Sequence, residues 1–142
     1  EKEIKARMEV LLENYAKTIN IEALTMIDMA GKQIIPAVVK YTKTLADTAN
    51  AIKAAGGDAS VQTELLADVS TKLAAMQKAL NKLVAEEKEA SAMEDVKAQA
   101  FFYKDTIKAT MDELRKPADE LEMIVDKDVW PIPTYGELMF EV

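Results

Sequence analysis

The sequence predicts an all-α fold: an antiparallel bundle of three to four long, kinked helices with an extended C-terminal tail rich in Pro and aromatic residues. Three observations support this prediction. Gly and Pro occur only four times each in 142 residues, as expected for long helices rather than sheets. Apolar side chains recur every three or four residues, the period of one helix face. Apolar residues make up 49% of the chain, enough for a single domain over residues 1–142 to bury its own core.

The first predicted helix covers residues 1–55. Its apolar residues are mostly three or four apart, from Met8, Leu11, Leu12 and Tyr15 onward. Gly31 and Pro36 interrupt the pattern. Since Pro lacks the backbone N–H and crowds the carbonyl group four residues earlier, we expect a kink or a short break between residues 31 and 36.

The second and third predicted helices cover residues 58–89 and 91–128. Gly56-Gly57-Asp58 forms the turn before the second helix, because glycine accepts the left-handed conformation that ends a helix and Asp58 or Ser60 can cap the next one. The second helix carries an apolar seam of Leu65, Val69, Leu73, Met76, Leu80 and Leu83. Ser91 and Glu94 have the spacing of a capping box for the third helix, in which Pro117 predicts a kink or a split.

Residues 129–142 form the predicted extended tail. Trp130-Pro131-Ile132-Pro133 disfavours helix, because a proline excludes the helical conformation from the residue before it. Trp130 and Tyr135 are costly to leave in water. Two interpretations remain open: the tail folds back over the bundle as a clasp, or it anchors the chain to another domain or subunit.

Composition and charge argue against several classes of function. The net charge of −7 disfavours nucleic acids and anionic membranes as partners. The longest apolar run, residues 34–39, is too short to cross a bilayer. The chain contains neither Cys nor His, and no glycine-rich phosphate loop is present. We therefore assign no catalytic, cofactor-binding or metal-binding residue, and we interpret Glu86, Glu87 and Glu89 as a solvated helix end.

The segment of residues 18–29 is apolar on nearly all sides of a helix, although it carries a few polar residues. A helix of this kind is usually covered on more than one face. It is therefore either a central core helix or a surface that another domain covers. For the second interpretation, the candidate interface residues are Ile21, Glu22 and Ile27, together with Trp130 and Tyr135 of the tail.

Two segments resemble a known family. Residues 15–30, YAKTINIEALTMIDMA, followed by IIPAV at 34–38, resemble the region after the catalytic domain of type III glutamine synthetases. The ending WPIPTYGELMF at 130–140 is similar to the closing motif of the same family, and residues 114–130 also fit it. The middle of the chain is generic helix.

The resemblance implies that the chain is a C-terminal helical domain and a fragment of a longer cytoplasmic ligase of glutamine biosynthesis and nitrogen metabolism. Such enzymes join ammonia to glutamate with ATP and a divalent metal (Mg or Mn), and they assemble as large homo-oligomers. Their catalytic residues lie in the upstream domain, so none is carried over to this chain. The expected partners are that catalytic domain and neighbouring subunits.

The leading hypothesis is a non-catalytic domain that buttresses the catalytic domain or mediates subunit contacts. The alternative is a stand-alone interaction module that binds an amphipathic helix in a groove containing Met side chains.

Overall fold

The computed structural model describes residues 1–133, which form helices and turns without a strand. The predicted all-α bundle is confirmed. In chain order the elements are α1 (Lys2–Met29), the π-helical turn η1 (Ala30–Ile34), α2 (Ile35–Ala54), α3 (Ser60–Ser91), α4 (Val96–Phe102), the π-helical turn η2 (Tyr103–Ile107) and α5 (Lys108–Ile124).

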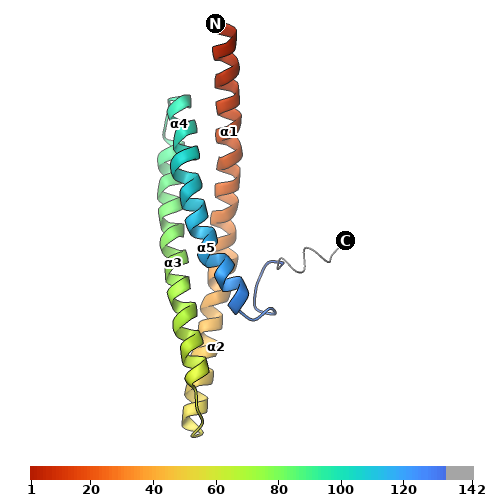
Figure 1. Ribbon diagram of the computed structural model, residues 1–142, viewed down its shortest axis with the longest axis vertical. Helices are drawn as coiled ribbons and strands as arrows, with labels where there is room; N and C mark the ends of the chain where they lie inside the picture. The colour runs from red at the N-terminus through yellow and green to blue at the C-terminus, as the bar shows by residue number, and fades with distance from the viewer. Residues whose placement is uncertain (134–142) are drawn as a thin grey trace.

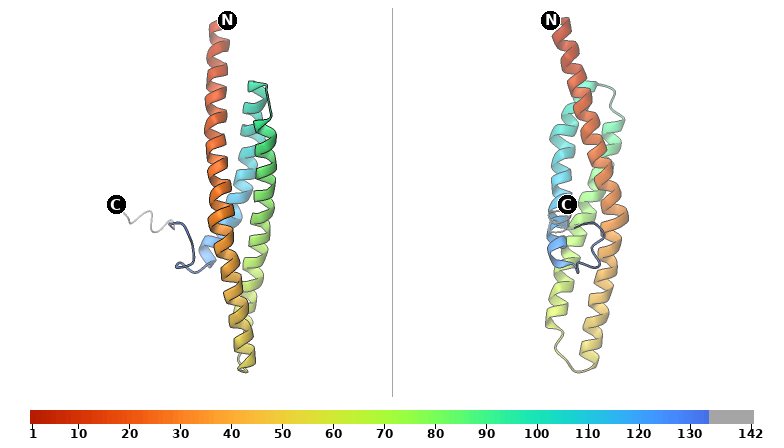
Figure 2. Two further views of the ribbon diagram at one scale, coloured as in Figure 1. Left: turned by 180° about the vertical axis from the view of Figure 1, so that it is seen from behind. Right: turned by 90° about the vertical axis from the view of Figure 1, so that its right-hand side faces the viewer.

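The elements form three antiparallel rods (Figure 1). The first rod is α1, η1 and α2 in continuous succession; α3 returns alongside it, and α4, η2 and α5 run back along α3. The rods differ in length. The N-terminal end of α1 extends beyond the turn between α3 and α4, and α5 ends before the turn between α2 and α3 (Figures 1 and 2). Both ends of the first rod therefore have fewer neighbours than its middle.

The core lies where the three rods run together. Leu83 of α3, Ile107 of η2, and Leu114 and Leu121 of α5 are almost completely buried. The seam predicted on the second helix is confirmed at Val69, Met76, Leu80 and Leu83, which are buried, whereas Leu65 and Leu73 are only partly buried against the core. The remaining buried apolar residues are mostly Ala, Ile, Val and Met, so the core is mainly aliphatic.

The helix does not break at Pro36. The irregularity expected between residues 31 and 36 takes the form of the π-helical turn η1, after which Pro36 lies in the first turn of α2. In this turn the N–H of Ile35 donates to the carbonyl oxygen of Ala30, five residues earlier. Proline is tolerated in a first helical turn. The rod therefore passes the proline without a gap.

The third predicted helix differs from the structure at both ends. Its beginning at Ser91 was wrong: Ser91 is the last residue of α3, and Asp95 is the N-cap of α4. Asp95 Oδ1 accepts hydrogen bonds from the N–H groups of Lys97 (2.9 Å) and Ala98 (3.3 Å). Helix α5 ends at Ile124 and continues through Pro117, so the predicted split did not occur. The irregularity of this rod is η2, ten residues or more before the proline.

The turn predicted at Gly56 is present. Gly56 has φ of +82°, a left-handed conformation that glycine adopts without strain. Asp58 Oδ1 accepts a hydrogen bond from the N–H of Ser60 at 3.0 Å. That bond lowers the pKa of the Asp58 carboxyl group, because it stabilises the charged form. Residues 56–60 thus reverse the chain between α2 and α3.

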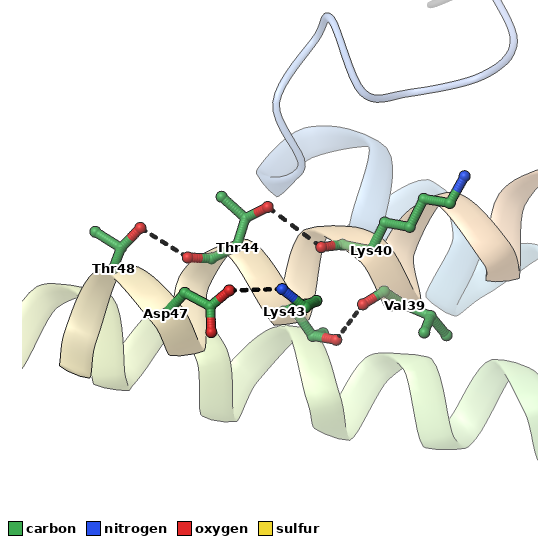
Figure 3. A network of polar contacts seen from close by, with 7 residues as sticks. Val39, Lys40, Lys43, Thr44, Asp47 and Thr48 are labelled. Carbon is green, nitrogen blue, oxygen red and sulfur yellow. Dashed lines mark hydrogen bonds and ion pairs between the residues drawn. The ribbon is translucent and has the colours of Figure 1, made fainter. Parts of the chain in front are cut away.

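The polar face of α2 is satisfied locally (Figure 3). Lys43 Nζ pairs with Asp47 Oδ2 at 2.8 Å, and the hydroxyl of Thr48 donates to the carbonyl oxygen of Thr44 at 2.7 Å. The hydrogen bond to Asp47 raises the pKa of Lys43. These contacts join residues four apart on one exposed helix, and such pairs contribute only a few tenths of a kcal/mol each. They leave this face as ordinary solvated surface.

The depth of the core can be tested with two leucines of α3. Leu83 is completely buried and Leu73 only partly. We expect Leu83→Ala to reduce the free energy of unfolding by about 2–5 kcal/mol. Leu73→Ala should cost only about 1–2 kcal/mol because less apolar surface leaves water. Urea denaturation followed by circular dichroism measures both. An equal loss for the two variants would contradict this placement of the core.

Candidate functional site

The segment of residues 18–29 lies in α1 with one face buried and the other exposed. Ile19 and Ala23 belong to the core. Ile21 is 65% exposed and Glu22 is also exposed, while Ile27 is partly buried against the core. The interpretation as a central helix covered on all sides is therefore wrong. Of the candidate interface residues on α1, Ile21 and Glu22 lie on free surface and Ile27 lies at its border.

Trp130 lies in the core of this chain. After α5 the chain turns at Asp126, whose carbonyl oxygen accepts hydrogen bonds from the N–H groups of Val129 (2.9 Å) and Trp130 (3.1 Å). Trp130 is only 7% exposed and belongs to the same apolar cluster as Val125. This part of the tail folds back on the bundle as a clasp. Tyr135, the other candidate of the tail, lies outside the described residues.

An apolar groove of about 410 Å³ lies beside the N-terminal half of α1. Its walls come from one face of α1 and from the end of α4 with the start of η2. Met8 and Leu11 are 58% and 68% exposed, and Phe101 is 44% exposed on the opposite wall. The lining residues are Met8, Leu11, Leu12, Tyr15, Ala100, Phe101 and Lys104. The sequence signal for this surface was present, since four of these residues begin the apolar pattern of the first predicted helix.

A second groove, of about 510 Å³, lies between α1 and α3. Leu24 and Ile27 line it from α1, and Leu80 and Val84 line it from α3. An ion pair between Lys32 Nζ and Asp28 Oδ1, 3.0 Å apart, lies at its edge. The candidate residue Ile27 therefore faces a groove within this chain rather than open solvent.

A buried polar cluster joins three elements, and sequence reasoning missed it. Glu87 of α3 is only 6% exposed and Tyr103 of η2 only 2%. Glu87 Oε1 accepts hydrogen bonds from the hydroxyl groups of Tyr103 and Ser91, both at 3.2 Å. Asn20 of α1 completes the cluster. With its amide nitrogen turned inward, Asn20 donates to Glu87 Oε1 and to the Tyr103 hydroxyl, the latter at 3.3 Å.

Burial dominates the electrostatics of the cluster. It raises the pKa of Glu87, and the hydrogen bonds from Tyr103 and Ser91 oppose that rise only in part, because they stabilise the carboxylate. Burial, followed by the negative charge of Glu87, raises the pKa of Tyr103 to about 12. Tyr103 therefore stays a neutral donor at physiological pH.

The interpretation of Glu87 as part of a solvated helix end was wrong. Glu89 is exposed, but Glu87 is buried. The sequence contained a signal: Leu80, Leu83, Glu87 and Ala90 continue the seam of α3 with steps of three and four. A charged residue at a seam position faces the core, where it needs hydrogen-bond partners.

The described part of the chain contains neither a metal-binding cluster of side chains nor a helix that could span a membrane. Within residues 1–133, no three acidic side chains gather closely enough to bind a metal ion. No helix in this range is both long and apolar enough to cross a membrane.

Comparison with known proteins gives one consistent result. Residues 1–53 match the family model described as the glutamine synthetase C-terminal domain. The chain is 39% identical over 142 residues to a glutamine synthetase of Butyrivibrio fibrisolvens. It is 30% identical over 146 residues to a glutamine synthetase of Bacteroides fragilis (strain YCH46), and 30% over 144 residues to a type-3 glutamine synthetase of Dictyostelium discoideum.

These alignments cover 97–99% of this chain but only 20% of each relative. The chain thus spans about a fifth of the length of the proteins that it matches. The predicted resemblance to the C-terminal helical domain of type III glutamine synthetases is confirmed.

The clasp can be tested at Trp130. Replacing this buried indole in Trp130→Ala should reduce the free energy of unfolding by about 3–5 kcal/mol, because a large core side chain is lost. Met123→Ala, at the end of α5, is the matched control, since Met123 is 87% exposed. Urea denaturation compares the two. A Trp130 variant as stable as the control would show that the indole does not hold the tail on the bundle.

Proposed function

We propose, from the similarity to the C-terminal domain of glutamine synthetases, that this chain is a non-catalytic helical domain that buttresses the catalytic domain of such an enzyme or mediates contacts between its subunits. The parent enzyme would join ammonia to glutamate with ATP and a divalent metal (Mg or Mn), as a large homo-oligomer in the cytoplasm. The observation that carries the proposal is the exposed apolar surface along α1, which no element among residues 1–133 covers.

The exposed apolar residues concentrate on α1. Ile4, Met8 and Leu11 are 65%, 58% and 68% exposed near its N-terminal end, and Ile21 is 65% exposed further along. Extended apolar surface of this kind marks contact sites with other proteins. The N-terminal end of α1 reaches beyond the α3–α4 turn (Figure 1), and Met8 and Leu11 line an open groove beside α4. A rod of this shape suits a strut between domains or subunits.

The chemistry of the parent is assigned to the four fifths of its length that this chain does not match. The present chain contains neither His nor Cys. Glu87, the one buried acidic residue among residues 1–133, is enclosed by Tyr103, Ser91 and Asn20. Enclosure by side chains of the same chain suits a group that holds helices together better than one that meets a substrate.

A second candidate function is a stand-alone module that binds an amphipathic helix. The groove lined by Met8, Leu11 and Phe101 favours it, because flexible Met side chains adapt to helical ligands. The gene separates the two functions. The first function requires an open reading frame about five times as long as this chain, with nucleotide and carboxylate motifs upstream. The second function requires no such upstream motifs.

The docking role can be tested in the full-length enzyme with Ile21→Asp. We expect this variant to weaken assembly and, through it, glutamine formation, because a charge at an apolar contact loses its hydration. Ile21 is exposed in this chain, so the helix content of the isolated domain should not change. Ile27→Asp should weaken assembly too, but it also disturbs the core that Ile27 borders.

Val61→Asp is the matched control. Val61 is 64% exposed, like Ile21, but it lies at the start of α3, at the opposite end of the bundle. Size-exclusion chromatography with light scattering measures assembly, and release of phosphate measures turnover. If the Ile21 variant assembles and turns over like wild type, α1 is ordinary surface and the proposed docking role is wrong.

A further inference from the structure

The polar cluster around Glu87 joins the exposed rod to the rest of the bundle. Asn20 comes from α1, Glu87 and Ser91 come from α3, and Tyr103 comes from η2. In sequence, Asn20 lies 67 residues from Glu87, so the cluster is a long-range tertiary contact. It lies within the buried stretch of α1, between the core residues Ile19 and Ala23. Beyond it, towards the N-terminus, α1 carries the most exposed part of its apolar surface.

The carboxyl group of Glu87 is held by hydrogen bonds alone. The ion pairs found among residues 1–133 do not include Glu87. A buried carboxylate without a cation loses hydration that neutral donors restore only in part. The neutral carboxyl group avoids this cost. The cluster is therefore sensitive to the protonation of a single side chain.

Asn20 ties α1 to this carboxyl group. With its amide nitrogen turned inward, Asn20 donates to Glu87 Oε1 and to the Tyr103 hydroxyl group. A protonated carboxyl group keeps acceptor capacity on its oxygens. The contact between α1 and α3 therefore does not require the charge of Glu87.

We propose that Glu87 is a proton-dependent latch that fastens α1 to α3 and η2: protonated Glu87 holds the N-terminal half of α1 firmly, and ionised Glu87 loosens it. This inference concerns the described chain alone and does not depend on the function proposed above. Such a latch changes how firmly α1 is attached to α3 and η2 without a change in the apolar core.

The direction of the pH dependence follows from burial. Since burial raises the pKa of Glu87, the folded chain binds this proton more tightly than the unfolded chain. The stabilisation is fully present below the unfolded pKa of Glu, and it is lost as the pH rises through the higher folded pKa. The attachment of α1 should therefore be firmest in mild acid and weaker at neutral pH.

Other titratable groups lie near the latch on each neighbouring element. Glu13 and Lys17 of α1 line a groove beside Asn20 and Tyr103, together with Gln99 of α4. Glu86 of α3 has one buried carboxylate oxygen without a hydrogen-bond partner. Lys88 of α3 directly follows Glu87 and Lys104 of η2 directly follows Tyr103, and both lysines are exposed. Tyr103 of η2, with its pKa raised to about 12, does not titrate in this range.

Hydrogen exchange of the isolated chain tests the latch. Protection factors of the amides of residues 16–23, corrected for the intrinsic rates, should fall at least about threefold between pH 5 and pH 7. Glu87→Gln should remove this fall, because glutamine keeps the shape of the side chain but has no carboxyl group to titrate. Glu89→Gln, the exposed carboxyl group two residues further on, should behave like wild type. An equal fall in wild type and in Glu87→Gln would overturn the proposal.

A titration of Glu87 by carbon NMR provides a second, independent test. Tyr103→Phe and Ser91→Ala each remove one donor to the carboxylate, so each should move the midpoint of Glu87 to higher pH. Both variants remove only a hydroxyl group and retain the apolar packing. A midpoint that stays in place or moves to lower pH in both would show that these hydroxyl groups do not bind the carboxylate, and the latch would be wrong.

Discussion

The unequal length of the three rods is the constraint on which the rest of this structure depends. The first rod joins 28 residues of α1, five of η1 and 20 of α2, whereas α3 has 32 residues. At 1.5 Å per residue a rod of that length cannot be covered by its neighbours along its whole course. Residues at its ends therefore stay exposed although they continue the apolar pattern, as Met8 and Leu11 do. Exposure here is a consequence of length rather than of composition.

The polar cluster at Glu87 lies on the stretch of α1 that is buried against α3 and η2. An apolar residue at position 87 would pack against α1 wherever the polar groups of α1 lie. A carboxyl group that needs Asn20, Tyr103 and Ser91 fixes both the height and the rotation of α1 against α3. While these hydrogen bonds are intact, the N-terminal part of α1 is held at one orientation, which an apolar seam alone specifies less sharply.

The sequence predicted the helices and their order because apolar periodicity and the Gly56 turn are local signals. It failed where two local signals competed. Ser91 and Asp95 are both suitable caps. In the structure Ser91 ends α3 and donates to Glu87 four residues earlier, and Asp95 caps α4. The clasp of Trp130 remained one of two open interpretations for a similar reason. Neither the periodicity nor the composition shows which apolar surface lies within reach of the tail.

The two π-helical turns show that a subtler signal was present in the seam. Ala30, Ile34 and Val38 are buried with consecutive steps of four residues across η1, and Tyr103, Ile107 and Met111 repeat this spacing across η2. Eight residues of ordinary α-helix exceed two turns by about 80°, which would rotate the third residue out of the core. A π-helical turn uses more residues per turn and cancels that rotation. In this chain three buried residues at steps of four run across each π-helical turn, whereas neither turn contains Pro36 or Pro117. The irregular geometry is favourable only where a neighbouring rod packs against the helix before and after the turn. Helix α3 provides this packing for η1 and for η2.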